Sequence, residues 1–115
     1  MKKIIKTLAV TALIALVLAN ATMVFARDYH VTNNGMGFNY DWKRYAAFNG
    51  GTCEMQYGFN TFAVNEDFCY AGMKYCQAYL TNGSGTHRGK AALYSNWSTI
   101  EWTHSGSYIV YGVTY

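Results

Sequence analysis

The sequence predicts an all-β protein, a small antiparallel meander that forms a β-sandwich or barrel. Three observations support this fold class. After the N-terminal segment, no long stretch has a helical apolar period. Short runs that alternate apolar and polar residues recur instead, and turn signals rich in Gly, Asn and Ser arrive every 8 to 15 residues.

The first 26 residues predict a secretory signal peptide. Three lysines precede an apolar run from Leu8 to Ala19, and the small residues Val24 and Ala26 fit a cleavage site. A cut after Ala21 fits as well. The run is short for a membrane span, which needs roughly 20 residues, so a retained anchor is the lesser alternative. We therefore expect a secreted, extracellular protein exported by a Gram-positive bacterium, with residues 27–115 as a single domain.

Within this domain, residues 27–41 predict irregular chain with at most one short strand. The following run, 42–48, ends at Asn49-Gly50, a strong two-residue hairpin signal. That hairpin would place Ala46 opposite Cys53 and Trp42 opposite Tyr57. The segment 59–67 has no clear pattern.

Three further turns complete the expected meander. Gly72-Met73 predicts a tight hairpin that places Cys69 opposite Cys76 and Tyr70 opposite Tyr75. The sequence NGSG at 82–85 predicts the next turn. Ser105-Gly106 would then pair the last two strands, with Trp102 facing Ile109 and Ile100 facing Tyr111.

Three cysteines can form one disulfide, which leaves one thiol unpaired. In an exported chain cysteines usually pair, and a Cys69–Cys76 disulfide fits the spacing of directly opposite strand residues. Cys53–Cys69 and Cys53–Cys76 remain open alternatives. With the first pairing Cys53 is free, either buried as a small apolar residue or joining two chains in a covalent dimer. The spacing matches no zinc motif.

Charge in the expected mature domain argues against two classes of partner. This domain carries six basic and six acidic residues, so its net charge is 0. The basic residues are Arg27, Lys43, Arg44, Lys74, Arg88 and Lys90, and the acidic residues are Asp28, Asp41, Glu54, Glu66, Asp67 and Glu101. Nucleic-acid binding needs a basic surface, and attraction to anionic lipid needs a polybasic cluster. We expect neither partner, and no stable membrane anchor after cleavage.

The chemistry of an enzyme is not visible in the motifs. HExxH, GxSxG, the Walker loop and the glycine-rich dinucleotide fingerprint are all absent. His30, His87 and His104 are scattered along the chain. We therefore predict a protein that is not an enzyme, with no catalytic residues, no metal and no cofactor.

Two segments resemble the lactococcin-972-like bacteriocins, small exported antibacterial proteins. In GGTCEMQYG, Gly51, Thr52, Tyr57 and Gly58 match the family pattern, with Cys53 at the usual tryptophan. In GMKYCQAYLTN, Gly72, Lys74, Ala78 and Asn82 match, with Cys76 at the usual histidine. The resemblance covers about residues 50–115. It implies a β-sandwich that acts on the envelope of competing Gram-positive bacteria by binding lipid II.

The hypothesis is thus a bacteriocin that binds the cell envelope without catalysis. Neutral charge favours contact through aromatic and hydrogen-bonding groups. One alternative is a module that binds cell wall or carbohydrate, with Trp42, Trp97, Trp102 or tyrosines stacking on sugars. Another is a secreted inhibitor or structural surface protein. The candidate binding residues are Tyr57, Tyr70, Tyr75, Tyr79 and Trp97.

Overall fold

The computed structural model describes residues 25–61, 64–72, 75–93 and 96–115, and the first 24 residues of the predicted signal segment 1–26 lie outside these ranges. Eight strands are present in the described chain. They are β1 Asp28–Thr32, β2 Trp42–Phe48, β3 Cys53–Asn60, β4 Glu66–Gly72, β5 Gln77–Asn82, β6 Gly85–Arg88, β7 Trp97–Thr103 and β8 Val110–Thr114. None of the described residues belongs to a helix that could cross a membrane.

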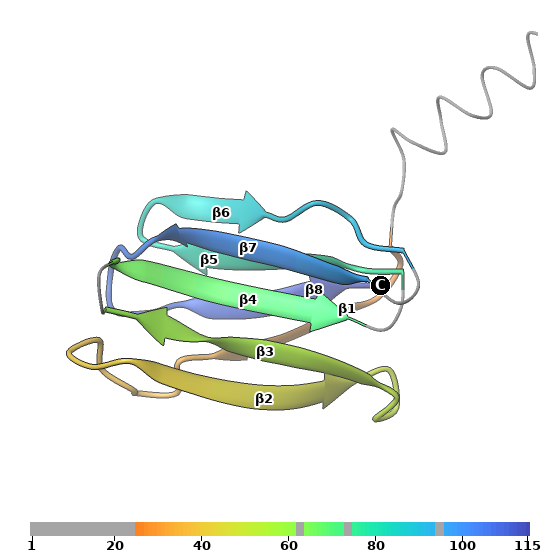
Figure 1. Ribbon diagram of the computed structural model, residues 1–115, viewed down its shortest axis with the longest axis horizontal. Helices are drawn as coiled ribbons and strands as arrows, with labels where there is room; N and C mark the ends of the chain where they lie inside the picture. Colours follow the sequence, from red (N-terminus) through yellow and green to blue (C-terminus); the bar gives the residue numbers. More distant parts are fainter. Residues whose placement is uncertain (1–24, 62–63, 73–74, 94–95) are drawn as a thin grey trace, which may run out of the picture.

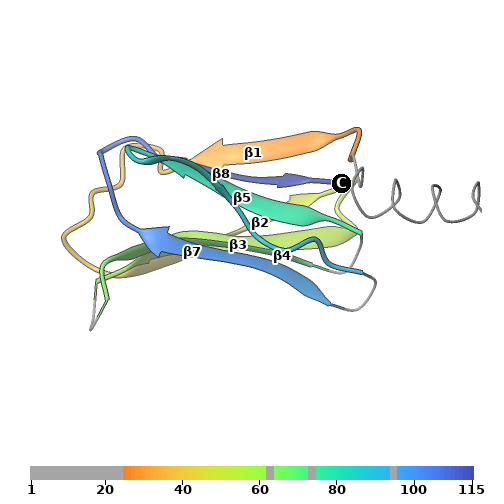
Figure 2. The same cartoon turned by 90° about the horizontal axis from the view of Figure 1, so that it is seen from above.

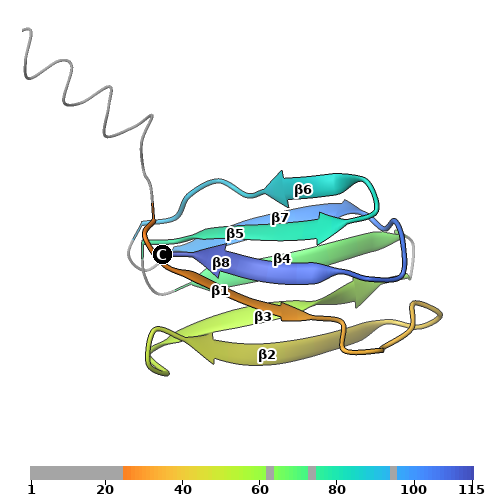
Figure 3. The same ribbon diagram turned by 180° about the vertical axis from the view of Figure 1, so that it is seen from behind.

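The strands form two antiparallel sheets (Figure 1). The first sheet has the order β1-β8-β5-β6, and the second has the order β2-β3-β4-β7. Seen from above, the sheets make two layers (Figure 2), and the first sheet lies in front when the molecule is viewed from behind (Figure 3). The predicted β-sandwich is confirmed, and buried side chains from both sheets form one core, as that fold requires.

The interior is filled by the inward-facing residues of both sheets. Trp42 packs edge-on against Tyr57 and Tyr111, with ring centroids 6.2 and 5.9 Å apart. Such edge-to-face pairs add about 0.5–1.5 kcal/mol to the stabilisation from burial. The largest completely buried side chains are Tyr111, Phe59, Met55, Leu80, Ile109 and Val113.

One polar atom in this core has no partner. The hydroxyl of Tyr111 is buried and makes no hydrogen bond to any part of the chain that the structure describes. Burial raises the pKa of Tyr111 above its ordinary value, so the phenol stays neutral. We expect Tyr111→Phe to raise the free energy of unfolding by about 1 kcal/mol, because it removes an unsatisfied buried group. Urea unfolding checks this; a loss of stability would mean that the hydroxyl has a partner.

The chain from 27 to 41 agrees with the expected single short strand followed by irregular structure. The irregular part is held by Asn33, which is 4% exposed. Its Nδ2 donates to the carbonyls of Met36 and Ser107 at 2.9 and 3.1 Å, and its Oδ1 accepts from the amide of Ile109 at 3.2 Å. One amide side chain therefore fixes this loop to the end of the sandwich.

The hairpin after β2 is confirmed, but its predicted register is wrong by two residues. Phe48 pairs with Cys53, and Trp42 pairs with Phe59. The loop has four residues because the left-handed backbone continues beyond the expected pair, with φ of 54° at Asn49, 66° at Gly50 and 87° at Gly51. A shift of two residues keeps every side chain on its face of the sheet.

Two of the other predicted hairpins are wrong. β4 pairs with β3 and β7, whereas β5 pairs with β6 and β8, so Gly72 ends a strand from which the chain crosses between sheets. The same holds for Ser105-Gly106, since β7 and β8 lie in different sheets. The turn at 82–85 is confirmed, with Asn82 paired to Gly85. Consecutive strands thus stay in one sheet from β2 to β4 and from β5 to β6, and the other connections cross between the two sheets.

The predicted Cys69–Cys76 disulfide is wrong for the same reason. Without the hairpin these residues are not cross-strand neighbours, and Cys53, Cys69 and Cys76 are all free and buried. The Cys69 thiol donates to the carbonyl of Gly112 at 3.4 Å, and the Cys76 thiol donates to that of Ala71 at 3.5 Å. Both thiols thus join the two sheets as core groups.

Candidate functional site

The outer face of the second sheet carries aromatic and hydrogen-bonding side chains in adjacent rows. Strand register aligns one row across β2, β3, β4 and β7, which contains Ala47, Glu54, Gly72 and Trp97. The neighbouring row contains Tyr45, Gln56, Tyr70 and Thr99. We call these two rows the aromatic face.

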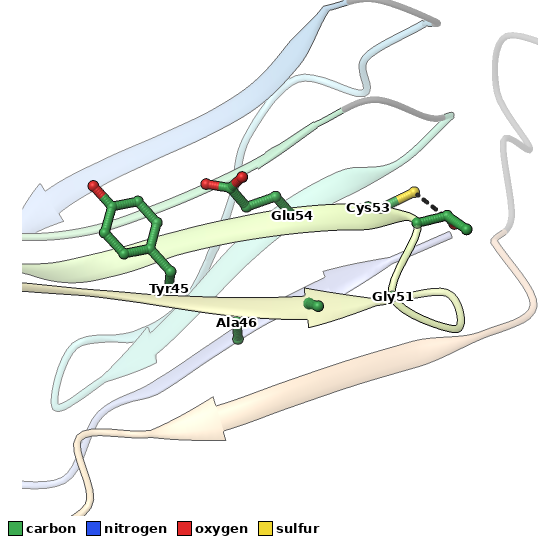
Figure 4. A pocket seen from close by; sticks show the side chains of 7 residues that line it. Tyr45, Ala46, Gly51, Cys53 and Glu54 are labelled. Carbon is green, nitrogen blue, oxygen red and sulfur yellow. Dashed lines mark hydrogen bonds between the residues drawn. The ribbon is translucent and has the colours of Figure 1, made fainter.

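The aromatic face is hollowed where its side chains are small. A hollow of about 490 Å³ lies over the end of the β2–β3 hairpin, between Tyr45 and the turn residues Gly51 and Thr52. Tyr45 and Glu54 project to the same side of the two strands (Figure 4). Since binding sites are concave and combine apolar walls with a few polar groups, this hollow is the candidate binding site. Its lining residues are Tyr45, Ala46, Ala47, Gly51, Thr52, Cys53 and Glu54.

Trp97 borders the far end of the same row. Its indole packs directly on Gly72, because a Cβ placed on that glycine would lie 2.5 Å from Cδ2 of Trp97. Gly72 is therefore required for close packing, which explains a glycine that the sequence pattern had attributed to a turn. The indole still has 38% of its surface exposed, so it is held in place and remains open to a ligand.

Tyr70 is held more rigidly than Trp97. Its hydroxyl donates a short hydrogen bond to Oε1 of Glu101, and its ring lies 5.1 Å from that of Phe68. Burial, followed by the hydrogen bond to Glu101, raises the pKa of Tyr70 above its ordinary value. The phenol therefore stays protonated at neutral pH and presents a fixed ring edge.

Polar groups lie between the rings. Gln56 Nε2 donates to Oε1 of Glu54 at 3.3 Å, and the ammonium of Lys43 lies 5.5 Å from the ring centre of Tyr45. The sheet thus offers carboxylate and amide oxygens beside aromatic surfaces. Together these groups suit a ligand that has both apolar faces and hydroxyl or amide donors.

The five predicted binding residues do not form one site. Trp97 and Tyr70 lie on the aromatic face, and Tyr75 is exposed in the chain before β5. Tyr57 is 8% exposed and lies in the core. Tyr57 lies in the core because successive side chains of a strand point to opposite faces, and its neighbour Gln56 points outward.

Tyr79 is also a packing residue, on the other sheet. Its ring covers Gly112, where a Cβ would lie 2.2 Å from Cζ, and the Arg88 guanidinium lies 5.0 Å from the ring centre. Its hydroxyl donates to Asp28 Oδ1 at 2.6 Å. With 9% of its surface exposed, Tyr79 has little area left for a ligand.

The sequence reasoning missed Tyr45, Glu54 and Gln56. A signal for Tyr45 was present, because it occupies the opposite parity from the buried Trp42 and Phe48 on the same strand. At 59% exposure Tyr45 is among the most exposed aromatic side chains of the described chain. Glu54 and Gln56 could be placed beside it only once the neighbouring strands were known.

Two histidines contact polar side chains in pairs that resemble catalytic arrangements. Ser84 Oγ lies 2.8 Å from Nε2 of His87, but its hydrogen is donated to Asn82 Oδ1 at 2.6 Å. The imidazole is then the donor to the serine and does not activate it as a nucleophile. His104 pairs with the buried Asp67 at 2.9 Å, as a structural contact described below. Among the described residues no cluster of three or more metal-ligating side chains occurs.

Cys69 and Cys76 are unreactive in this environment. Burial raises the pKa of Cys69 from 9.0 to about 12 and that of Cys76 from 9.0 to about 11. Because the thiolate is the nucleophile, both groups are protonated at neutral pH. Folding favours the protonated thiols, so this contribution to stability is complete below about pH 9 and is lost as pH rises towards about 12.

We therefore expect Ellman's reagent to react slowly with native residues 27–115, in which all three thiols are buried, and to find all three thiols after unfolding in guanidinium. A single thiol after unfolding without reductant would contradict this and indicate a disulfide. Non-reducing mass measurement also tests the predicted covalent dimer through Cys53.

No family model, curated protein or solved structure matches the chain.

Proposed function

We propose that the protein is an exported antibacterial protein that binds the saccharide part of a bacterial cell-envelope component through the aromatic face, without catalysis. The observation that carries the proposal is the alignment of Tyr45, Tyr70 and Trp97 with Glu54 and Gln56 on one face. Sugar rings present apolar faces to aromatic rings and hydroxyl groups to carboxylate and amide oxygens.

The antibacterial part of the proposal is supported by the resemblance to the lactococcin-972-like bacteriocins and by the signal-like N-terminus. The resemblance suggests lipid II as the target, and the aromatic face provides groups that suit its disaccharide. Cys76 occupies the position of a family histidine and is completely buried, so binding would depend on the aromatic face and not on this position.

Purified residues 27–115 test the proposal in three assays: sedimentation with Gram-positive peptidoglycan, capture on lipid II, and inhibition of growth. We expect binding in at least one of the first two and a growth defect in the third. Tyr108→Ala is the matched control, because Tyr108 is exposed at 66% but lies outside the aromatic face. Absence of binding to both envelope preparations would refute the proposal.

The same surface supports a second candidate, a module that binds wall or other carbohydrate without killing. Binding uses the same residues in both cases, so growth inhibition distinguishes them. Binding of peptidoglycan that leaves growth unchanged, at concentrations that saturate the cells, would favour the second candidate.

A further inference from the structure

We infer that the ligand of the aromatic face is an extended, uncharged, β-linked glycan that crosses the strands diagonally from Trp97 to Tyr45. This inference rests on the proposed function and specifies its ligand. It distinguishes a polymeric glycan, which contacts the whole diagonal, from a single lipid-linked disaccharide, which would contact one part of it.

The length of the diagonal follows from the strand register. Trp97 aligns with Gly72, Glu54 and Ala47, and Tyr45 lies two residues from Ala47 on β2. Three strand intervals of about 4.8 Å and two residues of about 3.4 Å give a separation of about 16 Å between the two Cα positions. A disaccharide does not cover this length, whereas a short oligosaccharide does.

The side chains along the diagonal are ordered so that a sugar chain can stack at both ends and form hydrogen bonds between them. From Trp97 the path crosses β4 between Gly72 and Tyr70, and then crosses β3 between Glu54 and Gln56. Aromatic surface therefore lies at each end, with hydrogen-bond acceptors between them. Gly72 adds no side chain to the surface where the path crosses β4, since any side chain there would clash with the Trp97 indole.

The shape of the surface favours a β-linked chain. The path runs over a sheet face with small residues at Gly72 and Ala47, and the hollow beside Tyr45 is open to solvent along the sheet. A glycan with equatorial linkages forms a flat ribbon that can stack its sugar faces on successive rings. A coiled, α-linked chain would leave the sheet after one contact.

The charges on this face select against an anionic polymer. Glu54, Glu66 and Glu101 point outward on β3, β4 and β7, and Lys43 is the outward cation on β2. Like charges repel a polyanion such as teichoic acid. The same carboxylates accept hydrogen bonds from the hydroxyl and amide groups of an uncharged glycan.

The test is calorimetric titration of residues 27–115 with β-1,4-linked N-acetylglucosamine oligomers, from the disaccharide to the hexasaccharide. We expect the affinity to rise by about tenfold or more over the series, which corresponds to about 1.4 kcal/mol. Trp97→Ala and Tyr45→Ala should each reduce this dependence on length, and Tyr108→Ala should leave it unchanged. Circular dichroism confirms that each variant is folded.

An affinity that is constant from the disaccharide onward would overturn the inference. Binding to lipid II without binding to any oligomer would overturn it as well, while leaving the proposed function in place. Tighter binding to teichoic acid than to the oligomers, or a dimer that blocks the face, would also overturn it. Failure to bind oligomers, peptidoglycan and lipid II alike would refute both the inference and the proposed function.

Discussion

The double variant Trp97→Ala/Tyr45→Ala is expected to lose about a hundredfold of its affinity for peptidoglycan, while its melting temperature stays close to that of the unchanged protein. Truncation of an aromatic contact residue commonly costs more than about 1.4 kcal/mol, or tenfold in affinity. Both side chains lie on the outer face of the sheet, at 38% and 59% exposure, so their removal uncovers the backbone of Gly72 but no inward-facing core side chain.

Sedimentation with peptidoglycan and thermal unfolding provide the two measurements. Tyr108→Ala should change neither, because this exposed tyrosine lies outside the aromatic face. If affinity and melting temperature fall together in the double variant, Trp97 and Tyr45 are packing residues and the assignment of the face is wrong.

Replacement of Asp67 by alanine is expected to lower the free energy of unfolding by about 3–5 kcal/mol. This carboxylate has no exposed surface. It accepts hydrogen bonds from His104 Nδ1 at 2.9 Å and from Asn82 Nδ2 at 3.1 Å. Its loss would leave His104 and Asn82 each without one hydrogen-bond acceptor.

The surroundings make that loss severe. The imidazole of His104 packs against Phe38 and Phe59, with ring centroids 4.1 and 5.0 Å away, and Asp67 itself has no exposed surface, so water has little access to the position of the carboxylate. A domain of this size has a total stability of about 4–13 kcal/mol. Urea unfolding should therefore show a variant that has lost a large part of its free energy of unfolding.

Asp28→Ala is the matched control, because Asp28 also pairs with a histidine. The Asp28–His30 contact is 2.7 Å, but its side chains are 43% and 56% exposed. Exposed pairs contribute about 0–1 kcal/mol, and the bond from Tyr79 adds a further modest amount. Equal losses in the Asp67 and Asp28 variants would contradict the role assigned to burial.

Strand positions were largely predictable from the sequence, and strand partners were not. Alternating apolar and polar runs, together with the turn signals, located strands such as 42–48 and 97–103, since side chains of a strand alternate between faces. This alternation does not show whether a strand pairs with the strand before it or lies in the facing sheet. The hairpins at Gly72-Met73 and Ser105-Gly106, and the Cys69–Cys76 pairing, failed for this reason.

The candidate site was half predictable for a related reason. Trp97 and Tyr70 were chosen as aromatic residues in a small domain, and they lie on the aromatic face. Tyr57 and Tyr79 were chosen on the same ground, but one lies in the core and the other covers Gly112. Aromatic identity alone does not distinguish packing from binding, because both need a large apolar surface. Knowledge of which strands are neighbours was needed to add Tyr45, Glu54 and Gln56.

The most direct test of the central claim, that the aromatic face binds the envelope saccharide, is a two-dimensional amide NMR titration. Isotope-labelled residues 27–115 would be titrated with the uncharged β-1,4-linked N-acetylglucosamine hexasaccharide. The account predicts the largest shifts at Ala47, Glu54, Gly72 and Trp97, including the indole N–H, with small changes on β1 and β8. Shifts that cluster on the outer face of the β1-β8-β5-β6 sheet, or no shifts at saturating glycan, would contradict it.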